Sequence, residues 1–497
     1  MPGTGDTGRK IMRISKLFKL HKTQAELDFV DIDPDQDTRL YLDSQLIGAS
    51  SHVFADRCHN TISNFFSFFL ELIQEGERDQ ARELFSYLSE PNETCLGSSH
   101  GKPNGRGIGN EQASEIFESI MRSRAIETGV LDHLEDFRIF VRGVGPDKVS
   151  DMTTNIIRKN LIEYTQNQCA LHNIPMRQGI ATNPWWNAET RRWERTHETM
   201  LVVKNRPILL VPKSLVSRGT FYSMEQYHRQ WVLNFVRREH LASNGPHVRR
   251  RKPKKGAKLG EAYVTKSDME KYVAPADKDY VAEFTQKHPK LFRDFKDFTK
   301  RKARPLTNAE INSTADISDL CFFLADKLVK TPTGNDHATD YHHLIVGILE
   351  LIFYPNLTCP VKEREINDGR KRIDLVFDNS AKSGQFFNLH QIRNITSPYI
   401  MVECKNYGKD VANPELDQLA GRFSANRGRF GMLLCRSVKN YKTLIQRCQD
   451  THKDQNGLII PILDNDLIEI LNAKADDPDS RPEEDFLAKR IREVALA

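Results

Sequence analysis

The last third of the chain alternates short apolar runs with helix-length amphipathic segments, and this rhythm constrains the fold more than any other feature. Apolar runs typical of strands occupy residues 372–377, 399–405, 430–435 and 458–463. Segments with helical periodicity occupy residues 344–353, 414–426, 441–452 and 466–471. Strands that alternate with helices of about ten residues favour a sheet with helices packed on its faces. An α/β domain is therefore predicted for the C-terminal third.

The N-terminal half is predicted to be a mixed α/β domain that is rich in helices. Residues 62–74 carry aromatic side chains at the spacing of a helix buried on a broad face. Residues 149–171 have the pattern of one long helix, with Ser150 as its cap. Strands are predicted at residues 137–141, 200–203 and 207–211.

A basic segment separates the two halves. Seven of the ten residues from Arg249 to Lys258 are Lys or Arg, and no acidic residue follows until Glu261. Like charges next to Pro and Gly disfavour a packed element, so this segment is predicted to be a linker or an exposed loop. The chain is accordingly divided into an N-terminal domain at 1–242, a basic linker at 243–262, a basic helical connector at 263–314 and a C-terminal domain at 315–497.

The connector contains a predicted basic amphipathic helix at residues 280–304. Phe292, Phe295 and Phe298 recur every three residues, among eight Lys and Arg side chains. Such a basic face is either solvated or in contact with nucleic acid, and both interpretations stay open. The basic linker has the same two interpretations, because a run of cations can follow a nucleic-acid backbone in a salt-sensitive way.

Composition excludes several classes of protein. The chain has 72 Lys and Arg against 67 Asp and Glu, a formal net charge of +5, so any basic surface must be local. Its eight cysteines form no CxxC pair, which favours reduced thiols in a cytoplasmic protein. Charged residues interrupt every long apolar stretch, so neither a secretory signal nor a membrane span is predicted.

An acidic residue inside a predicted strand points to the chemistry. Asp374 lies between two apolar residues, and burial of a lone carboxylate is costly unless a cation neutralises it. Glu403 and Lys405 alternate along the next predicted strand, so their side chains share a face. Two carboxylates and a lysine suit metal-assisted phosphodiester hydrolysis, with Mg²⁺ or Mn²⁺ on the carboxylates and the lysine assisting the attacking water. A simple salt bridge between Glu403 and Lys405 is the alternative.

Asp374 followed by Glu403, Cys404 and Lys405 resembles the signature of the PD-(D/E)xK, or restriction-endonuclease-like, nuclease superfamily. The resemblance covers residues 315–497 and implies an αβββαβ core with a metal-dependent nuclease site. It also implies that Gln418, on the helix after these strands, helps to fix the active site. The sequence departs from the family pattern in having Ile where the residue before the acid is often Pro, and in lacking the Tyr that often follows the Gln.

Further site residues follow from the same resemblance and from charge. Many members carry an acidic or polar residue on the first core helix, for which Asp340, His342 and Glu350 are candidates and Glu350 is preferred as a metal ligand. Four arginines follow the predicted site: Arg422, Arg427, Arg429 and Arg436. Because guanidinium groups make bidentate phosphate contacts, these four are predicted to bind nucleic acid, with solvated surface charge as the alternative.

The expected function is that of a metal-dependent endonuclease, acting on DNA rather than RNA because the superfamily mostly cuts DNA. By analogy of domain architecture, the N-terminal half would be a sensor or partner-docking module, as in effectors of bacterial anti-phage defence. A regulatory ligand, such as a nucleotide bound at the glycine-rich segment 97–109, is a further possibility. A homo-oligomer is expected, although no sequence motif indicates one. The main alternative is a catalytically inactive nuclease fold that serves as a nucleic-acid-binding or scaffold protein.

Overall fold

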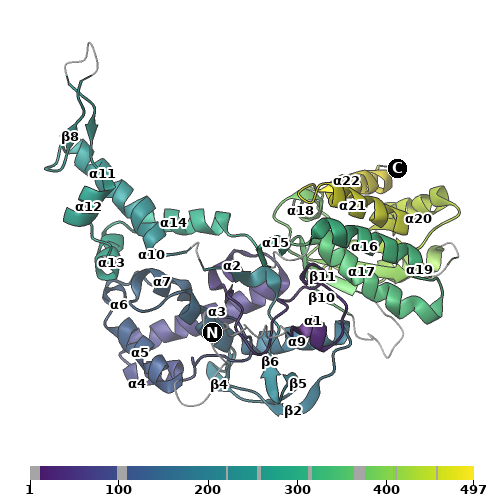
Figure 1. Ribbon diagram of the computed structural model, residues 1–497, viewed down its shortest axis with the longest axis horizontal. Helices are drawn as coiled ribbons and strands as arrows, with labels where there is room; N and C mark the ends of the chain where they lie inside the picture. Colours follow the sequence, from purple (N-terminus) through teal and green to yellow (C-terminus); the bar gives the residue numbers. More distant parts are fainter. Residues whose placement is uncertain are drawn as a thin grey trace, which may run out of the picture.

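A computed structural model shows a mixed α/β protein with two bodies (Figure 1). It describes residues 12–97, 109–219, 222–253, 259–311, 316–362, 375–406, 408, 411–454 and 457–496, with side chains from residue 113 onward in the second range. Asp374 and most of the glycine-rich segment lie outside these residues. Among the described residues, no helix is both long and apolar enough to cross a lipid bilayer.

Two separate hydrophobic cores define the bodies. The first core extends from Ile14 to Phe295 and also includes Cys359, and Ile311 packs against it. The second core is built almost entirely from residues between Leu320 and Val494. We call residues 12–311 the N-terminal body and residues 316–496 the C-terminal body. The segment predicted as a connector therefore contributes to the N-terminal core instead of standing apart from it.

The N-terminal body is mostly helical. Its helices are α1 (Ile14–Leu17), α2 (Ser44–Ala49), α3 (Val53–Glu75), α4 (Arg78–Phe85), α5 (Gly109–Met121), α6 (Arg124–Thr128), α7 (Phe137–Phe140), α8 (Pro146–Ile156), α9 (Arg158–Leu171), α10 (Met224–Tyr227), α11 (Leu233–Ala242), α12 (Lys266–Tyr272), α13 (Lys278–Lys287), α14 (Pro289–Lys302) and α15 (Asn308–Ile311). Its strands are β1 (Tyr41–Leu42), β2 (Arg177–Ala181), β3 (Trp185–Asn187), β4 (Arg192–Glu194), β5 (His197–Val203), β6 (Arg206–Ile208), β7 (Val216–Ser217), β8 (Arg249–Arg250) and β9 (Ala262–Tyr263). They pair only within small sheets, the largest having the order β2-β5-β6.

The aromatic helix predicted at residues 62–74 is confirmed as the second half of α3. Its buried ring Phe65 lies edge-on to Trp186, with ring centroids 5.1 Å apart, and close to Trp193. The helix ends at Gly76, whose left-handed backbone (φ 82°) suits a residue without a Cβ. Trp186 thus belongs to the core, and Trp193 packs against it.

Two other predictions for this half were wrong in detail. Residues Phe137–Phe140 form the short helix α7 and not a strand, because a short apolar run buried on all sides carries no periodicity that separates the two. The predicted helix 149–171 is two helices, α8 and α9, which meet at Ile157. Pro146 begins α8, so Ser150 lies inside that helix and accepts a hydrogen bond from the Leu42 N–H.

The predicted basic helix 280–304 is also divided. Pro289 begins α14 because its ring cannot continue α13, which ends at Lys287. The Phe295 ring is fully buried and stacks on Tyr222, with centroids 5.3 Å apart. This apolar stripe therefore belongs to the core, and the Lys and Arg residues of α14 surround it.

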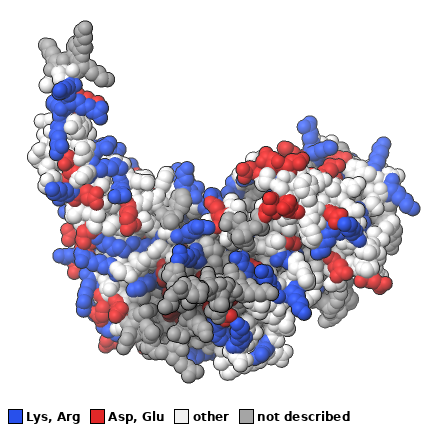
Figure 2. Space-filling view, viewed as in Figure 1, with Lys and Arg blue, Asp and Glu red and all other residues white. Residues whose placement is uncertain are grey.

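The basic linker contributes to an arm that projects from the N-terminal body (Figure 1). Strands β8 and β9 pair antiparallel next to α11 and α12, which contact each other. Figure 2 shows Lys and Arg side chains along this arm, and Arg249, Arg250 and Arg251 are exposed there. The described ends of the linker thus form two short paired strands. Cross-strand hydrogen bonds hold these strands together, although they have no apolar face.

The C-terminal body is a five-stranded sheet with helices packed on it. The strands are β10 (Leu357–Val361), β11 (Leu375–Asn379), β12 (Tyr399–Lys405), β13 (Phe430–Cys435) and β14 (Leu458–Leu463). The helices are α16 (Ile317–Lys330), α17 (Ala338–Phe353), α18 (Gly384–Gln391), α19 (Asn413–Ala420), α20 (Tyr441–Lys453), α21 (Asp464–Asp476) and α22 (Pro482–Ala495). Strands lie in chain order, antiparallel from β10 to β12 and parallel from β12 to β14.

The predicted alternation of strands and helices is confirmed here, with differences at the ends of elements. Helix α19 stops at Ala420, before Gly421, and does not reach residue 426. Helix α21 is longer than predicted, and α22 follows it. Strand β10 and helices α16, α18 and α22 were not predicted. Residues Ile400, Met401 and Val402 of β12 are all buried, so both faces of this central strand are covered.

Candidate active site

Strand β12 holds two of the predicted catalytic side chains at its C-terminal end. The Lys405 Nζ atom donates a hydrogen bond to Oε1 of Glu403 over 2.6 Å. Glu403 is only 1% exposed, whereas the Lys405 side chain retains some access to solvent. The alternation predicted from the sequence thus brings the carboxylate and the ammonium group into contact.

A second cation occupies the other oxygen of Glu403. The Arg422 Nη1 atom donates to Oε2 over 2.5 Å, from the turn that follows α19. Arg422 is buried, and its Nε and Nη2 atoms have no hydrogen-bond partner among the described residues. This arginine was predicted to bind nucleic-acid phosphate. In the structure it neutralises a carboxylate instead, together with Lys405.

The described part of the neighbouring strand β11 begins next to Glu403. Leu375, the first described residue of β11, is the cross-strand partner of Val402, which immediately precedes Glu403. Asp374 immediately precedes Leu375 in the sequence and lies outside the described residues. Its predicted role as a metal ligand stays a prediction.

The other arginines divide into two groups. Arg427 and Arg429 are exposed after α19, as a nucleic-acid contact requires. Arg436 is largely buried, forms an ion pair of 2.8 Å with Asp464 and donates to the Thr331 carbonyl over 2.7 Å. It therefore ties helices together and does not present its guanidinium group to a ligand. Gln418 is half-buried on α19.

Glu350, the preferred ligand on the first core helix, faces away from solvent toward the N-terminal body. Its Oε2 atom lies 3.5 Å from Nζ of Lys213, and both side chains are buried. Burial and the nearby Asp28 carboxylate raise the pKa of Glu350 to about 8, while burial lowers the pKa of Lys213. Its described basic neighbour at this distance is thus Lys213 and not one of the cations around Glu403. Of the alternatives, Asp340 is exposed and His342 is half-buried on α17.

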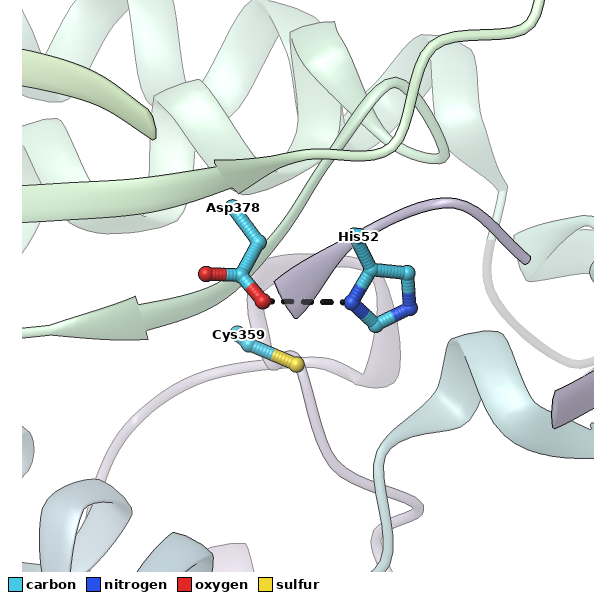
Figure 3. Close-up of side chains that lie close together, drawn as sticks. All are labelled: His52, Cys359 and Asp378. Carbon is cyan, nitrogen blue, oxygen red and sulfur yellow. Dashed lines mark hydrogen bonds and ion pairs between the residues drawn. The ribbon is translucent and has the colours of Figure 1, made fainter. Parts of the chain in front are cut away.

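Sequence reasoning missed a second group of side chains at the junction of the two bodies. His52, Cys359 and Asp378 are buried, and one possible metal-ligand atom from each lies within 4.8 Å of the others (Figure 3). His52 precedes α3, whereas Cys359 and Asp378 lie on β10 and β11. No spacing in the sequence could reveal this group, because more than three hundred residues separate His52 from its partners. An acid near the end of a predicted strand, Asp378, was the only local signal.

The fold is that of a mixed α/β protein. Comparison with known families found one family model that matches part of the chain. The family model described as "Domain of unknown function (DUF8370)" matches residues 19–223, which form most of the N-terminal body and less than half of the chain. The curated proteins and the solved structures that were compared include no match.

Proposed function

We propose that this protein is a metal-dependent endonuclease that hydrolyses phosphodiester bonds in nucleic acid, with DNA as the favoured substrate. The observation that carries the proposal is the buried Glu403 carboxylate in contact with Lys405 at the end of β12. The proposal requires Asp374 to stand beside Glu403, and the pairing of Leu375 with Val402 supports that requirement.

The order of elements supports a restriction-endonuclease-like core. Helix α17 precedes three antiparallel strands, β10 to β12, and then α19 leads to β13, which pairs parallel to β12. Helix α18 (Gly384–Gln391) lies between β11 and β12, so this order resembles the αβββαβ order that the sequence resemblance implies, with one additional helix. A carboxylate on the third strand and a helix that begins soon after it are both present. Fold similarity alone does not establish activity, so the proposal depends on the side chains of the site.

The donor atoms fit a hard divalent cation. Carboxylate oxygens are the ligands that Mg²⁺ and Mn²⁺ prefer, and Glu403 and Asp374 would hold the ion. When bound, such an ion polarises the phosphate and lowers the pKa of a bound water. Lys405 then places an ammonium group beside the reacting phosphate, where it orients the attacking water and stabilises developing negative charge.

The rest of the chain supplies the binding surface and the regulation in this proposal. Arg427 and Arg429 are exposed beyond α19, where they can contact backbone phosphates. By analogy of architecture, the N-terminal body would sense a trigger in an anti-phage defence system.

One observation favours a second candidate, a nuclease fold that binds nucleic acid without cutting it. Both oxygens of Glu403 are engaged by cations of the protein itself, and the side chain is buried. A divalent ion at Glu403 would have to share the carboxylate oxygens with Arg422 and Lys405 or displace one of them. In a catalytically inactive protein, this triad of charges would simply be structural.

A cleavage assay separates the two candidates. Supercoiled plasmid and single-stranded RNA are incubated with the full chain and Mg²⁺ or Mn²⁺, in parallel with Asp374→Asn, Lys405→Ala and the exposed-lysine control Lys442→Ala. The endonuclease proposal expects metal-dependent nicking by the wild type and by Lys442→Ala, with loss in the two site variants. Cleavage that survives both site substitutions, or no cleavage of either substrate with either metal, would reject it.

A further inference from the structure

The junction of the two bodies contains a compact set of three different metal-ligating side chains. The Nδ1 atom of His52 lies 3.2 Å from Oδ2 of Asp378, and the same oxygen accepts a hydrogen bond of 2.8 Å from the Phe54 N–H. In Figure 3 the Asp378 carboxylate and the Cys359 sulfur lie on the Nδ1 side of the imidazole ring. The three residues are almost completely buried.

A local distortion of β10 turns Cys359 toward this group. Thr358 is the cross-strand partner of Asp378, so the two share a face, and regular alternation would send Cys359 to the opposite face. The register shifts after Thr358, and Cys359 adopts a left-handed backbone with φ 50°. This conformation is uncommon for a residue with a side chain, and it costs free energy. It is found at bulges that redirect a functional side chain.

A further contact holds the distorted backbone in place. The Cys359 N–H donates to Oδ1 of Asp28 over 3.0 Å, and the Tyr164 hydroxyl donates to the other oxygen of the same carboxylate. Asp28 and Tyr164 both belong to the N-terminal body. The position of the Cys359 sulfur is therefore determined by both bodies together.

The same residue types occur in Cys-His-Asp catalytic triads, but the geometry excludes that role. In such a triad one ring nitrogen of the histidine contacts the acid and the other contacts the nucleophile. Here Nε2 points away from the other two side chains and is buried without a hydrogen-bond partner among the described residues. Burial also raises the pKa of the Cys359 thiol well above its ordinary value, and no substrate can reach it.

We propose that His52, Cys359 and Asp378 bind a zinc ion that joins the N-terminal and C-terminal bodies. Imidazole nitrogen, thiolate sulfur and carboxylate oxygen together are the donor set of Zn²⁺, whereas Mg²⁺ and Ca²⁺ select oxygen alone. A divalent ion balances the charge of a thiolate and a carboxylate, which removes the penalty of burying them. The separation of the His52 nitrogen and the Asp378 oxygen is already close to that of two ligands of one ion.

This site is independent of the proposed nuclease function. Its ligands come from different residues, its metal belongs to a different class, and its role is to fix one body on the other. Binding of the ion favours the assembled state, because the unfolded chain does not hold the three ligands together.

Metal content tests the proposal directly. The full chain is purified, exposed to excess Zn²⁺, dialysed against a weak chelator and analysed by elemental mass spectrometry. Cys359→Ser is compared with Cys448→Ser, which makes the same change at a buried cysteine of the C-terminal body. We expect one zinc ion per chain in the wild type and in Cys448→Ser, and loss of that ion in Cys359→Ser.

A second measurement remains decisive if a variant fails to fold. Co²⁺ is substituted into the wild-type protein, and the near-ultraviolet absorption is recorded. A thiolate-to-cobalt charge-transfer band in the wild type, lost in the near-isosteric Asp378→Asn or shifted by it, supports the site. Absence of retained zinc and of the band in folded wild type, or unchanged retention in both Cys359→Ser and Asp378→Asn, would overturn it. Neither result depends on nucleic-acid cleavage.

Discussion

The guanidinium group of Arg422 and the carboxylate of Glu403 form a buried ion pair, with 2.5 Å between Nη1 and Oε2. Lys405 holds the second carboxylate oxygen at 2.6 Å. A surface pair of this kind contributes little to stability because water screens it. Inside the protein, removal of one partner leaves a charge that is poorly compensated in a medium of low polarity.

Loss of the Arg422 side chain should therefore destabilise the C-terminal body. We expect Arg422→Ala to lower the free energy of unfolding by about 3 kcal/mol, since Lys405 still compensates part of the Glu403 charge. The exposed Arg427→Ala should change it by less than about 0.5 kcal/mol. Urea unfolding of the full chain measures both. Equal, small effects would show that the pair does not stabilise the protein in solution.

Replacement of exposed arginines should affect nucleic-acid binding and leave stability unchanged. We expect Arg427→Ala combined with Arg429→Ala to weaken DNA binding and to reduce the slope of log affinity against log salt by about 1 for each phosphate that is no longer bound. Fluorescence anisotropy over a series of salt concentrations gives this slope. The exposed Arg492→Ala on α22 is the control. An unchanged slope in the double variant would remove these residues from the binding surface.

The raised pKa of Glu350 predicts how stability depends on pH. Because its pKa in the folded protein is about 8 and its ordinary value is 4.5, the folded state binds more protons between these values, and this group lowers stability as pH rises through that window. Glu350→Gln should remove the loss. Its stability relative to the wild type should increase by about 3 kcal/mol from pH 5 to pH 8.

Unfolding curves at several pH values check this trend. Asp340→Asn, an exposed acid on the same helix α17, is the control and should follow the wild type. If Glu350→Gln runs parallel to the wild type across this range, Glu350 is already ionised in the folded protein at neutral pH.

His343 predicts a pH dependence of opposite sign. Burial and neighbouring positive charge lower its pKa from 6.5 to about 4, so the unfolded chain binds more protons than the folded protein between these values. The contribution of this group is present above about pH 6.5 and is lost as pH falls toward 4. His343→Gln should reduce the acid loss by about 1 kcal/mol, after allowance for partial solvent screening. His337→Gln, next to the start of α17, is the control variant, and an equal effect of both substitutions on the acid limb would contradict the assignment.

The aromatic stripe of α14 should behave as core and not as a nucleic-acid surface. Phe295 is fully buried, and its ring centroid lies 4.9 Å from that of Tyr227. We expect Phe295→Ala to cost about 3 to 5 kcal/mol of unfolding free energy. Phe323→Ala, at a half-exposed position on α16, should cost much less. Thermal unfolding compares the two, and a small effect at Phe295 would mean that α14 is not packed in solution.

Local sequence patterns predicted much of the C-terminal body. Strands β12, β13 and β14 lie where apolar runs indicated them, because a covered sheet needs such runs wherever its strands are buried. Elements without a clear period were missed or misassigned, as at α7 and β10. Hydrophobic periodicity alone predicted helices that were too long at two places. There the helices end before Pro289 and before Gly421.

The candidate site shows the same division. Alternation along one strand brought Glu403 and Lys405 together, since neighbours two apart share a face. The partner on the other oxygen, Arg422, could not be assigned from the sequence, because a surface arginine and a buried one look alike until the turn after α19 is placed. The same holds for Glu350, whose partner Lys213 lies in the other body.

By itself, the sequence determined the alternating α/β plan of the last third and the contact between Glu403 and Lys405, because short-range periodicity controls which side chains face each other within an element. Only the tertiary structure decided which charges are buried together and how the two bodies meet. The approach of His52 to Cys359 and Asp378 depends on packing between segments more than three hundred residues apart, and on a bulge in β10. Such contacts arise from the global fold and leave no mark in local spacing.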